Sequence, residues 1–239
     1  MKKLLSLSII AMFIFANCTT MGTGTYSGYR GSSEPVLARS LFSSDQAVIS
    51  QAAIDTILSS KIVIPENVKL ALIKFSGSID QNSSIYGYGY WRSESYLKLQ
   101  QSYVDTLSNR ILASEKIHSV SILPSLLTPQ NPTIPILREA AVRLQSPLLV
   151  IYRINSDIYE EYRTFRANRS KAYATVELVL LDIRTGIIPF TAISTKEFQS
   201  TKQKDDVTVN DFLKRTEAVA VNRALEDTAE RLTRFLGSN

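Results

Sequence analysis

A short segment in the second half of the chain, residues 147–154 (PLLVIYRI), is apolar at almost every position. A strand covered on one face alternates apolar and polar residues, whereas a strand covered on both faces is apolar almost throughout. The segment therefore predicts a strand inside a sheet that carries helices on both faces. We expect Leu149, Val150 and Ile151 to be almost completely buried.

Two further β-prone segments follow this strand. Residues 172–183 and 187–198 are rich in β-branched and aliphatic residues, and Arg184-Thr185-Gly186 lies between them. A glycine in a short polar break between two such segments is typical of a tight turn. We therefore expect an antiparallel hairpin at one edge of the sheet, with residues 159–165 as a candidate extension of the sheet.

The rest of the domain alternates between helical and strand-like patterns. Ser44 and Thr133 are the expected N-caps of two of the helices. Apolar spacing predicts helices over 45–59, 94–113, 134–144 and 209–236, and further strands over 68–75 and 117–123. This order predicts an α/β fold with a single mixed β-sheet. Its first half is parallel, the hairpin is antiparallel, helices pack on it, and a long C-terminal helix ends the chain.

Residues 1–17 have the features of a secretory signal peptide. Lys2 and Lys3 precede an apolar segment, residues 4–16, that only two serines interrupt. At about 13 residues, this segment is too short for a transmembrane helix, which needs about 20. We expect the leader to be removed on export.

The only cysteine of the chain, Cys18, stands directly after this leader. The sequence Phe15-Ala16-Asn17-Cys18 resembles the bacterial lipobox, in which the cysteine is acylated and the signal is cut before it. Phe15 and Asn17 depart from the strict pattern. We expect Cys18 to be the lipidation site, and a non-lipidated signal peptide with an incidental cysteine is the alternative.

The mature chain is expected to consist of a tether and one domain. Residues 18–43 are rich in Ser, Gly and Thr, which is typical of a flexible linker, and residues 44–239 form the α/β domain. Thr19 is not the aspartate that signals retention in the inner membrane, so we expect an outer-membrane lipoprotein. The three acyl chains of a bacterial lipoprotein exceed the roughly two lipid signals that stable anchoring to a membrane needs.

The charge pattern argues against binding to nucleic acid. The net charge of +5 includes the two leader lysines, so the mature chain carries +3. Its basic and acidic residues are interleaved, without the basic cluster that nucleic-acid binding needs.

Few side chains are suited to catalysis. His118 is the only histidine and lies in an expected strand, and we expect it to be partly exposed there. Neither a Ser-His-Asp nor a Cys-His arrangement is available, and metal sites built from His and Cys lack ligands. The acidic pairs Glu160-Glu161 and Asp205-Asp206 are expected to be solvated loop charges. We therefore expect no enzyme, no catalytic residue, no metal and no cofactor.

The segment IYGYGYWR, in the loop after the first expected strand, has the most unusual composition. Tyr, Trp and Arg are enriched at the centres of protein interfaces. The segment is therefore a candidate surface for binding a protein or a glycan. The alternative is that its rings fold back onto the domain. The candidate binding residues are Tyr86, Tyr88, Tyr90, Trp91 and Arg92.

A second candidate surface lies at residues 159–169. Tyrosine, phenylalanine and arginine alternate there, which suits binding. The same alternation also gives a sheet edge one apolar and one charged side, and this solvated edge is the favoured interpretation. The alternating residues are Tyr159, Tyr162, Arg163, Phe165, Arg166 and Arg169.

Three segments resemble a group of periplasmic α/β domains that includes the lipoprotein CsgG, the N-terminal domain of TolB and the lipoprotein LpoB. They are the first strand (residues 68–75, VKLALIKF), the helix at 136–144 that leads into the strand at 148–152, and the Thr-Gly hairpin in LLDIRTG at 180–186. This resemblance implies a non-enzymatic lipoprotein that faces the periplasm. It would bind and regulate an envelope component, as LpoB modulates a cell-wall synthase. The alternative is a subunit of a CsgG-like secretion assembly, which would require an oligomeric ring.

Lipidation at Cys18 leads to the first testable outcome. The protein should incorporate a radiolabelled fatty acid, and Cys18→Ser should abolish the label and release the domain from membranes. A wild-type chain that stays on membranes without any label would contradict the expected lipidation.

Overall fold

The computed structural model describes residues 41, 50–75, 93–129, 132–164 and 166–238. Within these residues, helices and strands follow one another in the order that the sequence predicts, with one short 3-10 helix added. The elements are α2 (Gln51–Ser59), β1 (Val68–Lys74), α3 (Glu94–Leu112), β2 (Ile117–Ile122), η3 (Ser125–Leu127), α4 (Ile134–Arg143), β3 (Leu148–Glu161), β4 (Arg169–Asp182), β5 (Phe190–Thr201) and α5 (Val209–Ser238).

The strands form one mixed sheet of five, in the order β2-β1-β3-β4-β5. β1 pairs in parallel with both β2 and β3, and β3, β4 and β5 pair antiparallel. The expected mixed sheet, with a parallel first half and an antiparallel hairpin at one edge, is therefore confirmed. β3 occupies the centre, where Val150 lies between Leu72 of β1 and Leu180 of β4.

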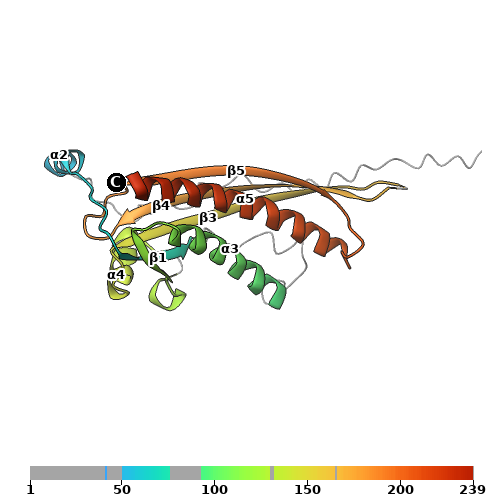
Figure 1. Ribbon diagram of the computed structural model, residues 1–239, viewed down its shortest axis with the longest axis horizontal. Coiled ribbons are helices and arrows are strands. Elements are labelled where there is room, and N and C mark those ends of the chain that lie inside the picture. Colours follow the sequence, from blue (N-terminus) through green and yellow to red (C-terminus); the bar gives the residue numbers. More distant parts are fainter. Residues whose placement is uncertain (1–40, 42–49, 76–92, 130–131, 165, 239) are drawn as a thin grey trace, which may run out of the picture.

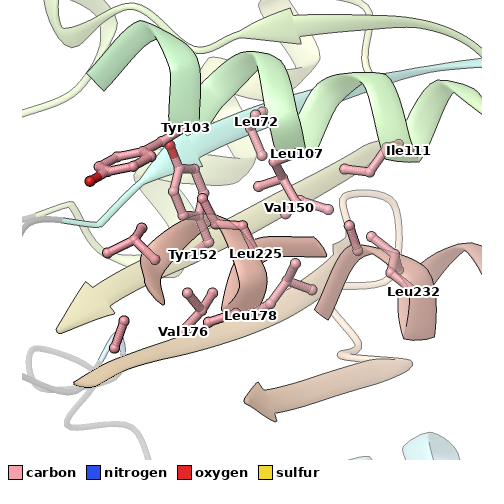
Figure 2. Packing of buried hydrophobic residues seen from close by; sticks show 14 of the residues in the cluster. Leu72, Tyr103, Leu107, Ile111, Val150, Tyr152, Val176, Leu178, Leu225 and Leu232 are labelled. Atoms are coloured by element: carbon pink, nitrogen blue, oxygen red, sulfur yellow. The ribbon is translucent and has the colours of Figure 1, made fainter. Parts of the chain in front are cut away.

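Helices cover the sheet on both faces (Figure 1). α3 and α5 pack on one face, where side chains from α3, β1, β3, β4 and α5 meet in the larger part of the core (Figure 2). α4 packs on the other face over the ends of β3 and β4 that lie near Leu149 and Leu181. Leu149 and Val150 are 0% exposed and Ile151 is 3% exposed, which confirms the expected burial of this strand.

β3 is longer than the apolar segment that predicts it. β1 ends at Lys74, which pairs with Tyr152, so the second half of β3 has no β1 strand beside it. That half is covered by helices on one face only, and its sequence changes to an alternating pattern in which Ile158 points into the core. The candidate extension of the sheet at 159–165 is confirmed as far as Glu161.

The starts of the helices depend on different caps. Ser93 accepts a hydrogen bond from the backbone of Tyr96 and begins α3. Thr133 stands at the N-cap of α4, as expected, but its side chain makes no capping bond there, and Pro135 lies in the first turn. Ser50 caps α2, whereas the expected cap Ser44 lies outside the described residues.

The turn between β4 and β5 confirms the Thr-Gly hairpin but is wider than expected. The Asp182 carboxylate accepts hydrogen bonds from the backbone of Arg184 and from the Thr185 hydroxyl. Gly186 has a φ of +77°, a backbone conformation that residues with a side chain rarely adopt. β5 then begins at Phe190 rather than at residue 187. Arg138 of α4 donates to the carbonyls of residues 183 and 184, so α4 is fastened to this turn.

Asp206 corrects one expectation about the acidic pairs. Asp205 is exposed, but Asp206 is buried in the segment between β5 and α5 and forms an ion pair of 2.8 Å with Arg215. Its carboxylate also accepts a 2.7 Å hydrogen bond from the backbone of Gln203. The Arg215 guanidinium and this backbone donor lower the pKa of Asp206. The side chain is therefore a structural anchor between the end of β5 and α5.

Substitution of Val150 tests the buried centre of the sheet. Val150→Asp should prevent stable folding, because an unpaired buried carboxylate costs several kcal/mol, out of a total stability of about 5–15 kcal/mol. Val142→Asp on α4 is the matched control, since Val142 is 61% exposed and the change should cost less than about 0.5 kcal/mol. Chemical denaturation followed by circular dichroism measures both, and a folded Val150→Asp protein would contradict the packing.

The Asp206–Arg215 pair predicts a pH dependence of stability. Because the folded-state pKa is lowered, the pair stabilises the fold above the unfolded pKa of about 4, and this contribution is lost as the pH falls through the folded value. Asp206→Asn should lower the free energy of unfolding by about 1–3 kcal/mol at pH 7. The difference from the wild type should shrink at acidic pH. Asp205→Asn is the control, and equal losses for both variants would refute the assignment.

Candidate functional site

The structure describes some of the predicted functional residues and not others. His118 is exposed on β2, as expected, and its Nδ1 lies 3.0 Å from the carbonyl oxygen of Asn67. The second candidate surface, residues 159–169, forms the end of the β3–β4 hairpin. The lipidation site and the aromatic candidates lie outside the described residues, so they stay predictions: Cys18, Tyr86, Tyr88, Tyr90, Trp91 and Arg92.

A polar surface lies on the long strands, on the face opposite α5. We define the distal sheet face as the odd-numbered residues within 153–159 of β3, 171–177 of β4 and 193–199 of β5, which share one side of the sheet. α4 covers the proximal part of the same side, up to Ile151 and Leu181. Each residue of the distal sheet face is at least partly exposed.

Cross-strand pairs hold the side chains of this face in place. Arg153 donates to both carboxylate oxygens of Glu177, each at 2.7 Å. The hydroxyl oxygens of Thr175 and Thr195 lie 2.9 Å apart. Such opposite-charge and hydroxyl pairs stabilise a sheet by roughly 0.2–1 kcal/mol each. They also fix the positions of groups that could donate to or accept from a ligand.

Two tyrosines form the aromatic part of the face. Their rings, Tyr159 and Tyr173, meet edge to face with centroids 5.9 Å apart. The Tyr159 hydroxyl donates to Asp157 at 2.8 Å. Lys171 lies over the Tyr173 ring, with its Nζ 4.7 Å from the centroid, and pairs with Glu197 at 2.8 Å.

Lys171 stays fully charged near neutral pH. The hydrogen bond to Glu197, followed by the contribution of Tyr173, raises the pKa of Lys171 to about 12. The face therefore presents a fixed cation beside a partly exposed ring. This combination suits stacking and hydrogen bonding with a sugar ring or a peptide side chain.

The end of the β3–β4 hairpin projects beyond the helices (Figure 1). Tyr162 is 80% exposed there, and Arg163 forms an ion pair of 3.1 Å with Glu161. Asn168 accepts from the backbone of Arg163 and donates to Glu160, so it joins the two strands at the turn. The favoured interpretation, a solvated sheet edge, fits the charged residues of this segment, whereas Tyr162 is an exposed aromatic side chain.

The described residues contain no cluster of His, Cys, Asp and Glu that could bind a metal ion. Nor does any helix in the described part of the chain have the length and apolar character of a membrane span.

Sequence reasoning missed most of the distal sheet face. The pattern is present in the sequence, because β4 up to Leu180 and β5 alternate between more buried and more exposed positions. The strand register is also needed to predict that Arg153 pairs with Glu177 and that Thr175 pairs with Thr195. A single sequence does not determine this register.

The chain matches no protein-family model and no curated protein. Solved structures that resemble it include the hypothetical protein CT253 from Chlamydia trachomatis, at 14% identity over 72% of this chain and 99% of that one, with a TM-score of 0.42. A minor lipoprotein from Acinetobacter baumannii has 14% identity over 73% and 94%, with a TM-score of 0.32. The C-terminal domain of LpoB from Salmonella enterica has 11% identity over 60% and 92%, with a TM-score of 0.31. At TM-scores below 0.5, these similarities carry no argument about function.

Proposed function

We propose that this chain is a lipoprotein, anchored to a membrane through Cys18, whose domain binds another component of the bacterial cell envelope. It would act as an adaptor or regulator of envelope assembly, in the manner of LpoB, and would catalyse no reaction itself. The partner would be a protein or a glycan on the periplasmic side of the outer membrane.

The observation that carries the proposal is the distal sheet face. One side of the sheet formed by β3, β4 and β5 packs against α5, while the other side presents fixed polar and aromatic groups to solvent. Tyrosine is enriched in binding surfaces because it supplies a large contact area at little cost in conformational entropy. The leader and Cys18 add the expectation of a membrane anchor, which would keep this surface near envelope components.

Site-specific photo-crosslinking of the full chain in cells tests this function. A photoreactive residue at Tyr173, which is 36% exposed, should give a discrete adduct with an envelope component, identified by mass spectrometry. The same residue at Val142 on α4 is the matched control and should give none. A second position at Trp91 tests the aromatic segment that the sequence singles out.

The anchor provides a further control for this experiment. If the chain binds its partner at the membrane, Cys18→Ser should reduce the amount of the Tyr173 adduct while leaving the domain folded. Equal adducts at Tyr173 and Val142, or none at either Tyr173 or Trp91, would overturn the proposed function.

A further inference from the structure

Among the described residues, no strand pairs with the outer edge of β5, which is 12 residues long. The backbone of Lys202 donates to the carbonyl of Asn168 just beyond the β4–β5 ladder, so the even-numbered residues of β5 bond to β4. The odd-numbered residues therefore direct their backbone N–H and C=O groups outward. Such a row of unpaired groups is a template for another strand.

Neither a proline nor a bulge interrupts this edge, although β5 carries the charged residues Lys196 and Glu197. The only proline nearby, Pro189, precedes β5, and the β4–β5 register runs without a bulge. Among the described residues, Arg231 donates to the carbonyl of Ile193 at 3.4 Å and Arg215 donates to the carbonyl of Thr201 at 3.2 Å. Between these two, the outward groups from Thr195 to Gln199 are available for pairing.

Arginines of α5 line the same edge. Arg215 is engaged with the buried Asp206, and Arg231 forms an ion pair of 2.8 Å with Asp227. Arg223 differs, because it is exposed and stacks on the Phe198 ring at 4.6 Å without an acidic partner among the described residues. An unpaired guanidinium held beside an open strand edge suits a carboxylate on an added strand.

The charges favour a foreign strand over a second copy of this chain. Antiparallel pairing of two β5 edges would place both α5 helices on one side of the extended sheet, so their arginines would face each other across the seam. An acidic strand would instead bring carboxylates to Arg223 and Arg231. The two residues of β5 that these arginines contact, Phe198 and Ile193, are five residues apart.

Building on the envelope-binding function above, we propose that the β5 edge binds an extended acidic segment of a partner protein by strand addition. The backbone of that segment pairs with Thr195, Glu197 and Gln199. Its carboxylates, about four residues apart on one side of the strand, contact Arg223 and Arg231. The arginines select the charge of the partner, and the edge selects its extended conformation.

Binding of a synthetic strand to the purified full chain in detergent tests this inference. The probe is a fluorescent peptide of the length of β5, about 12 residues, in which glutamate alternates with threonine. It should bind, and peptides with lysine in place of glutamate, or with methylated outward amides, should not. Arg223→Glu should weaken binding by about tenfold or more, and rising salt should weaken binding to the wild type.

Two matched controls separate the charge from the backbone. Arg143→Glu changes an exposed arginine on α4 by the same charge and should leave the affinity unchanged. Thr195→Pro removes an outward N–H without breaking the β4–β5 ladder and should abolish binding, whereas Thr195→Val keeps the N–H and should bind normally. If the Thr195→Pro protein is unfolded, the comparison of Arg223→Glu with Arg143→Glu still tests the inference.

Other outcomes overturn the inference in distinguishable ways. Equal binding of the lysine and glutamate peptides refutes the charge selection, and a dimer of the chain that Thr195→Pro disrupts makes a second copy the occupant. If Tyr173 gives its envelope adduct in cells but the glutamate peptide does not bind, the strand-addition site fails while the proposed function stands. If the peptide binds but neither Tyr173 nor Trp91 gives an adduct, the edge site stands without the proposed function.

Discussion

The packing of α5 along β3, β4 and β5 is the interaction on which the rest of the structure depends. The second half of β3 and the first half of β4 extend past β1, so neighbouring strands alone would leave one side of them with an apolar surface. α5 covers that surface with small residues, among them Ala220 and Ala224, which allow the helix to lie close to the sheet. A helix of 30 residues is long enough to follow strands of this length.

Polar contacts set the position of α5 along the strands. Ser156 of β3 donates to the buried Glu217, and Lys196 of β5 donates to Asp227 at 3.0 Å. Each contact satisfies a charge that would otherwise be costly to place against the sheet, and a shift of the helix by one turn would break both contacts. Hydrophobic burial therefore supplies the attraction, and these pairs determine where the helix stops.

The sequence predicts the elements better than it predicts the surface. The segment around Val150 is apolar because it is covered on both faces, and that property can be read without any knowledge of its neighbours. The end of β3 and the burial of Asp206 could not be predicted in this way. Both depend on contacts between separate elements. The exposed second half of β3 follows from the end of β1 beside Tyr152, and the burial of Asp206 follows from its ion pair with Arg215 on α5. The distal sheet face depends on strand register and was missed for the same reason.

The distal sheet face and the β5 edge differ in whether their charged side chains are paired. On the distal sheet face, Arg153 is paired with Glu177 and Lys171 with Glu197, so a ligand there must add to satisfied pairs or displace them. At the β5 edge, Arg223 stacks on an aromatic ring, and among the described residues it has no acidic partner and the backbone groups next to it have no strand partner. A partner bound at the edge would therefore gain more per contact than one bound on the face. The face would contribute contact area, and the edge would decide which segment binds.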